Sequence, residues 1–196
     1  VAYKGNGTAG HQIPHSLSKV PEMIWVKRRD SARTWGVYHK GLNGGTNPEQ
    51  YALYLDANSA NSGTSQWNNT APTSTHFSLG TSPTSNNSSG TYIAMLFASV
   101  DGISKVGYYT GNGSTLAISL GFQPRFVFLK SESGTGNWNV LDTTRGWASG
   151  NDQVLELQAT GAQQAFDVAE PTSTGFTLTS TQNNVSGTNY VYYAHA

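Results

Sequence analysis

The amino-acid sequence predicts an all-β fold, an antiparallel β-sandwich of jelly-roll-like form built from two internal repeats. Three observations lead to this prediction. The apolar segments are short, they are separated by clusters of Gly, Asn, Ser and Thr, and several blocks of residues recur in the same order in both halves of the chain. Short segments rich in β-branched and aromatic residues, bounded by turn-forming residues, are typical of strands.

The composition supports a folded domain and excludes several classes of protein. Of 196 residues, 22 are Gly, 22 Ser, 22 Thr and 16 Asn, and aromatic residues make up 11%, which is enough to build a core. Because Lys and Arg (11) balance Asp and Glu (11), we expect no general electrostatic binding of nucleic acid. No apolar run approaches the length of a membrane span, so we expect no membrane insertion. The absence of Cys excludes disulfides and thiolate nucleophiles.

The duplication is the strongest signal in the sequence. Tyr3–Gly7 matches Tyr109–Gly113, and Pro21–Lys27 matches Pro124–Lys130. Further matches follow in the same order: Trp35–Val37 with Trp138–Val140, Pro72–Leu79 with Pro171–Leu178, and Ser89–Ile93 with Ser186–Val191. We therefore predict repeat 1 over residues 1–107 and repeat 2 over residues 108–196. Because the junction Val106–Tyr109 has the pattern of a strand and not of a linker, we expect one continuous β domain over residues 1–196.

Each repeat supplies five predicted strands in the same order. In repeat 1 they are Met23–Arg28, Trp35–His39, Tyr51–Leu55, His76–Leu79 and Tyr92–Ser99. In repeat 2 they are Arg125–Lys130, Trp138–Leu141, Val154–Leu157, Gly175–Thr179 and Tyr190–Ala194. Only Asn151–Ala169 has a composition compatible with a short helix, and Gly161 weakens it. The Gly-Asn-Gly segments at 5–7 and 111–113 are interpreted as hairpin turns.

The two repeats carry opposite charge. Repeat 1 has eight Lys and Arg against five Asp and Glu, a net +3, whereas repeat 2 has three against six, a net −3. Drift after duplication explains this difference, and so does electrostatic complementarity between halves or between subunits.

No catalytic or metal-binding motif is present. His11 and His15 have the spacing of a zinc pair, but Pro14 lies between them and no Glu adjoins either. No Gly-x-Ser-x-Gly turn occurs, and no motif selects a pair of carboxylates for glycoside hydrolysis. We therefore expect a protein that is not an enzyme and that uses no cofactor and no metal.

The aromatic residues divide into expected core residues and one expected surface residue. Trp35 matches Trp138, Trp25 matches Phe128 and Trp67 matches Phe166, so these are expected to fill the interior. Strand alternation places Tyr190 and Tyr192 on one face and Tyr193 on the other. Trp147 has no firm counterpart and follows Arg145-Gly146, so it is the candidate for an exposed aromatic that stacks on a sugar. The candidate ligand-binding residues are thus Trp147, Arg145 and Tyr193.

Several blocks resemble a known family. They are Tyr3–Gly10, Ile13–Leu17, Val26–Ser31, Trp35–Leu42, Trp67–Thr75 and Tyr92–Ala98. The chain resembles an uncharacterised duplicated β-rich domain of bacteriophage tail and virion-associated proteins, of the type found in phages of marine bacteria and cyanobacteria. Repeat 2 departs from the pattern at Asp142–Arg145, where repeat 1 has His39-Lys40, which is compatible with a binding role confined to one half.

The resemblance implies a non-enzymatic virion structural or host-adhesion module, such as a tail fibre or another surface-exposed protein. Its expected location is the virion surface or the extracellular space. Its expected partners are neighbouring virion subunits in a homo-oligomer and cell-surface glycans, with no nucleic acid. Three alternatives remain open: a carbohydrate-binding module of a secreted enzyme, a capsid-decoration or filament scaffold subunit, and a glycan depolymerase, which needs a carboxylate pair.

Overall fold

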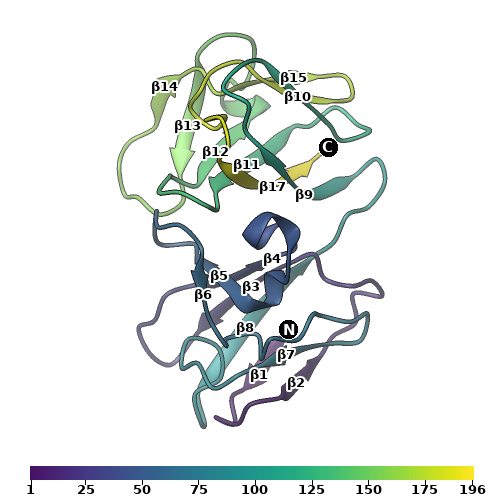
Figure 1. The fold of residues 1–196 in the computed structure, drawn as a ribbon, viewed down its shortest axis with the longest axis vertical. Coiled ribbons are helices and arrows are strands. Elements are labelled where there is room, and N and C mark those ends of the chain that lie inside the picture. The colour runs from purple at the N-terminus through teal and green to yellow at the C-terminus, as the bar shows by residue number, and fades with distance from the viewer. The chain divides into compact units, whose positions relative to one another are not determined.

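The structure, a computed structural model that describes residues 1–196, consists of short strands and three single-turn 3-10 helices (Figure 1). It divides into two compact units, Val1–Ala98 and Ser99–Ala196. All strand pairs are antiparallel, and the predicted all-β, two-repeat sandwich class is confirmed. None of the helices combines the length and the apolar character needed to cross a bilayer.

The first unit contains eight strands and two 3-10 helices. They are β1 (Ala2–Lys4), β2 (His11–Pro14), β3 (Met23–Arg28), β4 (Gly36–His39), η1 (Leu42–Gly45), η2 (Pro48–Gln50), β5 (Tyr51–Tyr54), β6 (Ser62–Gly63), β7 (His76–Leu79) and β8 (Thr91–Phe97). A six-stranded sheet has the order β1-β8-β3-β4-β5-β6, and a second sheet pairs β2 with β7.

The second unit contains nine strands and one 3-10 helix. They are β9 (Ser104–Thr110), β10 (Leu116–Ser119), β11 (Phe126–Ser131), β12 (Asn139–Asp142), η3 (Thr143–Arg145), β13 (Asp152–Glu156), β14 (Gln164–Phe166), β15 (Ala169–Thr172), β16 (Gly175–Leu178) and β17 (Asn189–His195). Its large sheet has the order β9-β17-β11-β12-β13-β14, and its small sheet the order β10-β16-β15.

The large sheets of the two units have the same strand order, whereas β15 of the second small sheet has no counterpart in the first unit. Each strand of the first large sheet has a counterpart at the same place in the second, from β1 and β9 at one edge to β6 and β14 at the other. The register also agrees, since Tyr3 lies opposite Tyr92 and Tyr109 lies opposite Tyr190. These two tyrosine pairs stack with ring centroids 5.1 Å apart in both units. The duplication inferred from the sequence is therefore present in the fold.

The two units divide the chain at a different place from the predicted repeat boundary. The division lies between residues 98 and 99 and not between 107 and 108, and each sheet belongs entirely to one unit. The physical reason lies in β9. The segment Val106–Tyr109 is a strand, as expected, but it pairs with β17 at the end of the chain and thus begins the second unit.

Each unit has its own hydrophobic core. In the first, alternate residues of β3 (Ile24 and Val26) face a cluster that includes Tyr38, Trp67 and Phe77. In the second, Val127 and Leu129 of β11 face the larger of the two clusters, which includes Trp147 and Phe176. Tyr190 and Tyr192 belong to that cluster whereas Tyr193 does not, which confirms the predicted alternation along β17.

The segment Asn151–Ala169, whose composition is compatible with a short helix, forms β13, β14 and the start of β15. One local expectation is wrong. The Gly-Asn-Gly segments are not hairpin turns, because β1 pairs with β8 while β2 pairs with β7. They carry the chain from the large sheet to the small one. The positive φ expected there occurs at the second glycine of each, Gly7 (73°) and Gly113 (73°).

The expectation that matched aromatics fill the interior holds for only part of the set. Trp67 and Trp138 are buried, at 2% and 0% exposure. Trp25 and Trp35 are half-buried, and the ammonium of Lys27 lies 5.4 Å from the ring centroid of Trp35. Trp35 is therefore only partly buried, and one face of its ring makes a cation–π contact.

Candidate functional site: an uncharged pocket in the second unit

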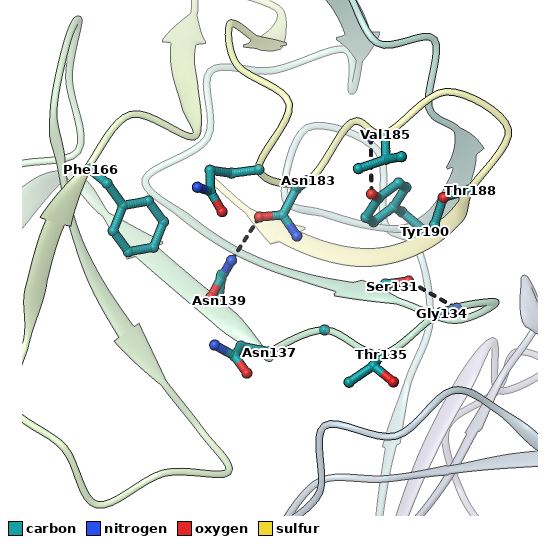
Figure 2. Close-up of a pocket in the computed structure, with 12 residues that line it drawn as sticks. Ser131, Gly134, Thr135, Asn137, Asn139, Phe166, Asn183, Val185, Thr188 and Tyr190 are labelled. Atoms are coloured by element: carbon teal, nitrogen blue, oxygen red, sulfur yellow. Dashed lines mark hydrogen bonds between the residues drawn. The ribbon is translucent and has the colours of Figure 1, made fainter.

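A pocket of about 420 Å³ opens in the second unit and is lined by uncharged residues, most of which are polar (Figure 2). Its polar side chains are those of Ser131, Thr135, Asn137, Asn139, Gln182, Asn183, Thr188 and Tyr190. Phe166 and Val185 supply apolar surface, and Gly134 and Gly136 complete the lining. The volume lies within the range of small-molecule sites, about 300–1,000 Å³.

The large sheet supplies the floor of the pocket and two loops supply its walls. Ser131 at the end of β11, Asn139 at the start of β12, and Tyr190 in β17 are buried. The loop that joins β11 to β12 carries Thr135, and the loop before β17 carries Val185; both of these residues are exposed. Neighbouring strands thus fix the buried polar groups, while the exposed groups stand at the rim.

Hydrogen bonds hold both loops in place. The backbone N–H of Gly134 donates to Ser131 Oγ over 3.1 Å, and the backbone N–H of Val185 donates to the hydroxyl of Tyr190 over 3.1 Å (Figure 2). The backbone N–H of Asn189 donates to Ser133 Oγ over 2.8 Å and so joins the loop after β11 to the start of β17. Because the protein's own groups hold these loops, less order has to be imposed when a ligand binds, which lowers the entropic cost of binding.

A pair of buried amides forms the deepest polar part of the pocket. The side-chain Nδ2 of Asn139 donates to Oδ1 of Asn183 over 2.7 Å (Figure 2). The two residues are 6% and 3% exposed. The remaining acceptor, Asn139 Oδ1, is buried and has no hydrogen-bond partner. A buried acceptor without a partner costs about 1–3 kcal/mol, a cost that a hydrogen-bond donor on a ligand would remove.

The electrostatic character of the pocket is neutral. No Asp, Glu, Lys, Arg or His lines it. The nearest carboxylate in the hydrogen-bond network, that of Glu156, accepts from Asn137 Nδ2 (2.6 Å) and Gln158 Nε2 (3.1 Å). Behind Tyr190, burial, followed by the neighbouring tyrosines, raises the pKa of Tyr109 well above its ordinary value, so this hydroxyl stays neutral. Its O–H donates to the carbonyl of Asn183 over 2.6 Å.

The structure does not support Trp147 as a ligand-binding residue, and the expectation that it is exposed is wrong. Trp147 is 2% exposed and belongs to the core cluster of the second unit. Its ring packs edge-on against Phe176, with centroids 6.3 Å apart, and its indole N–H donates to the carbonyl of Ala169 over 2.7 Å. The short helix η3 turns the chain so that this side chain enters the core.

The other two candidates lie apart from the pocket lining. The guanidinium of Arg145 pairs with the carboxylate of Asp142 and donates to the carbonyl of Val140 and to Gln163 Oε1, each over 3.2 Å. Tyr193 lies on the opposite face of β17 from the core residue Tyr192 and stacks on Phe128 at 5.7 Å. The three candidate residues therefore do not form one site.

His39 and Asp142 each accept a hydrogen bond from the backbone of the turn that follows them. His39 is buried, and its Nδ1 accepts from the backbone N–H of Gly41 over 3.0 Å. Asp142, at the matching position in the second unit, accepts from the backbone N–H of Arg145 over 2.9 Å. Both side chains thus begin the turn after the fourth strand of the large sheet. No cluster of three or more His, Asp and Glu side chains is placed to hold a metal ion.

The pocket residues were missed because the sequence comparison gave weight to matches and not to differences. Asn139 stands where repeat 1 has Gly36, in a block recognised by Trp35 and Trp138. The segment Gly134-Thr135-Gly136, which forms one wall, has no glycine pair at the matching place in repeat 1. These replacements are the signal that a search for divergence between the repeats would have found.

Comparison with known proteins identifies a family but no function. A family model described as "Domain of unknown function (DUF7483)" matches residues 1–196. No curated protein and no solved structure matches the chain.

Proposed function

Because the chain belongs to the family described as a domain of unknown function, DUF7483, we propose its function from its own geometry: it is a non-enzymatic glycan-binding adhesion module. The observation that carries this proposal is the uncharged pocket, in which amides and hydroxyls surround a small volume bordered by Phe166, Tyr190 and Val185. Sugars present hydroxyl groups around an apolar ring face, so amide donors and acceptors beside aromatic surface are suited to bind them.

The proposal includes binding without chemical change. Glycoside hydrolysis uses two carboxyl groups that flank the scissile bond. The pocket lining contains no carboxyl group and no imidazole that could act as a general acid or base. We therefore expect the protein to release a bound glycan chemically unchanged. Mass spectrometry of the glycan after prolonged incubation with the protein checks this.

The proposed location is the surface of a virion, where the module would contact host glycans. This part of the proposal is supported by the resemblance of the blocks around Trp35 and Trp67 to domains of phage tail and virion-associated proteins. The polar, uncharged loops of the chain suit a surface that meets a hydrated glycan coat.

Binding to an array of bacterial envelope and storage glycans tests the proposal. We expect reproducible binding to a subset of glycans at micromolar to millimolar concentration, with no dependence on added metal. If neither the array nor titration with millimolar monosaccharides detects binding, the glycan-binding function is wrong.

A second candidate function, assembly into a homo-oligomer of virion subunits, is favoured by one observation. The first unit, residues 1–98, carries a net charge of +3 and the second, residues 99–196, a net charge of −3. Opposite charge on the two units suits head-to-tail contact between copies. Sedimentation at increasing salt is the test: association should weaken as exposed charges are screened over about 10 Å at 0.1 M. Association that is absent at low salt contradicts this candidate.

A further inference from the structure

The residues at the floor of the pocket differ from those at the matching places in the first unit, although the two large sheets share one strand order. By register, Arg28 corresponds to Ser131, because they lie opposite Tyr92 and Tyr190. Gly36 corresponds in the same way to Asn139, since they lie opposite Val26 and Leu129. The side chains at these two floor positions of the pocket therefore differ between the units both in size and in chemistry.

Large side chains occupy the corresponding space in the first unit. A Cβ atom at Gly36 would lie 2.1 Å from Nε2 of Gln66, so the fully buried Gln66 takes the place that Asn139 has in the second unit. Gly90 corresponds in the structure to Thr188, because their carbonyls accept from the equivalent N–H groups of Gly5 and Gly111. A Cβ atom at Gly90 would lie 3.2 Å from Nε of Arg28. Arg28 is itself held there by an ion pair with Asp30 at 2.7 Å. Side chains therefore fill this region in the first unit, whereas the corresponding region of the second unit is the open pocket.

The chemistry of the open pocket selects a neutral ligand. Its lining offers no cation to neutralise a carboxylate, sulfate or phosphate, and the second unit as a whole carries net negative charge. An anionic sugar entering it would lose hydration without gaining a charge-assisted hydrogen bond. A neutral sugar needs only hydrogen bonds and an apolar contact, both of which the lining supplies.

One buried atom determines which end of the ligand enters first. Asn139 Oδ1 has no partner in the protein, while its Nδ2 is engaged by Asn183. A ligand that brings a donor, a hydroxyl or an amide N–H, within reach of this oxygen would supply the missing hydrogen bond. Because a site built around a buried acceptor strongly rejects analogues that lack the donor, this pair is suited to determine specificity.

We propose that each chain binds one uncharged sugar residue through the Asn139–Asn183 amide pair, in the pocket of the second unit alone. This inference rests on the glycan-binding function proposed above. The identity of the residues at positions 131 and 139 distinguishes the binding unit from the filled one. Ser131→Arg and Asn139→Gly, which introduce the residues of the first unit, should each close or disable the site.

NMR titration of the full, isotopically labelled chain tests this proposal. The probes are the methyl glycosides of glucose, galactose, mannose and N-acetylglucosamine, compared with glucuronic acid and N-acetylneuraminic acid. We expect at least one neutral sugar to shift backbone amides in the segments 131–139 and 182–190, to saturate at one sugar per chain, and to bind at least ten-fold more tightly than either acid.

Matched variants separate the pocket from the rest of the surface. Ser131→Arg and Asn139→Gly should each weaken binding at least ten-fold. Ser173→Arg and Asn151→Gly make the same changes at exposed positions outside the lining and should leave the affinity within two-fold. An unchanged dispersion of the amide spectrum shows that each variant is folded.

The outcomes distinguish failure of this inference from failure of the proposed function. Neutral sugars that bind but shift only amides of the first unit, or that bind equally well to Ser131→Arg, overturn the pocket assignment and leave glycan binding standing. Tighter binding of the acidic sugars overturns the selection for neutral ligands. Absence of any sugar binding, on the array and by NMR, overturns both.

Discussion

The backbone N–H of Asn6 donates to the side-chain oxygen of Asn86 over 2.9 Å, although 80 residues separate them in the chain. Asn112 and Asn184 make the same contact in the second unit, also over 2.9 Å. The other end of the buried Asn86 amide donates to the carbonyls of Thr8 (2.9 Å) and Gly80 (2.7 Å). One amide thus fastens the loop that crosses between the two sheets.

Replacing this amide should destabilise the first unit strongly. Asn86→Ala leaves a backbone donor and two carbonyls without partners, so we expect the free energy of unfolding to fall by about 2–4 kcal/mol. Urea unfolding followed by tryptophan fluorescence measures the change. Asn87→Ala is the control, since the Asn87 side chain bonds only the exposed carbonyl of Ser88, and it should cost under about 0.5 kcal/mol. Equal effects of the two substitutions would contradict the role of Asn86.

The contact between Gly36 and Gln66 can be tested by a pair of substitutions. Gly36→Ala places a methyl group against the buried amide of Gln66 and should cost about 1–3 kcal/mol, the usual range for overpacking. Adding Gln66→Ala to the same chain should recover most of this loss, because the obstructing side chain is then gone. Additive effects in the double-mutant cycle would show that Gln66 does not fill this space.

Trp147 provides a test of core packing against surface recognition. Trp147→Ala should lower the free energy of unfolding by about 3–5 kcal/mol, because it leaves a cavity in the core of the second unit. Trp147→Phe should cost less and should keep sugar affinity within two-fold of the unaltered chain. Thermal denaturation and the NMR titration measure the two effects. A variant that loses sugar binding while keeping its stability would return Trp147 to a role in recognition.

Lys130 should make stability depend on pH in the alkaline range. Burial, only partly offset by the charge of Glu132, lowers the pKa of Lys130 from 10.5 to about 8. Between pH 8 and 10 the unfolded chain then binds more protons at this residue than the folded chain. The free energy of unfolding should therefore rise across this interval, by about 2 kcal/mol.

The measurement compares the unaltered chain with Lys130→Met between pH 8 and pH 10. Lys130→Met should remove the rise, whereas Lys4→Met, at an exposed position, should keep it. A rise that persists in Lys130→Met would assign the dependence to another group.

Most strands of the two large sheets could be predicted from the sequence, because their apolar, β-branched and aromatic residues form a local pattern. All ten expected strands, from Met23–Arg28 to Tyr190–Ala194, correspond to strands of the structure. The weaker strands were missed for physical reasons: β6 has two residues, Ser62 and Gly63, and β2 ends at Pro14. Their positions depend on pairing partners far along the chain, which periodicity does not reveal.

The candidate site shows a different limit of sequence reasoning. In the sequence, Trp147 looks like a recognition residue because it follows Arg145-Gly146 and has no firm counterpart in repeat 1. Only the direction in which η3 turns the chain places its side chain in the core. Asn139 and Asn183 are 44 residues apart and become a pair only because β12 and the loop before β17 meet at one end of the large sheet. Such long-range juxtaposition leaves no local trace.

The open pocket of the second unit and the filled one of the first have a consequence for attachment strength. Under the function proposed above, a lone chain is monovalent, and one small uncharged pocket would give weak, rapidly reversible attachment to a surface that carries glycans. Several chains that are fixed side by side raise the effective concentration of each remaining site, and avidity then exceeds the single-site affinity by about 10²–10⁴. The number of chains held together, more than the pocket itself, would then set how long the proposed module stays attached to a surface that carries glycans.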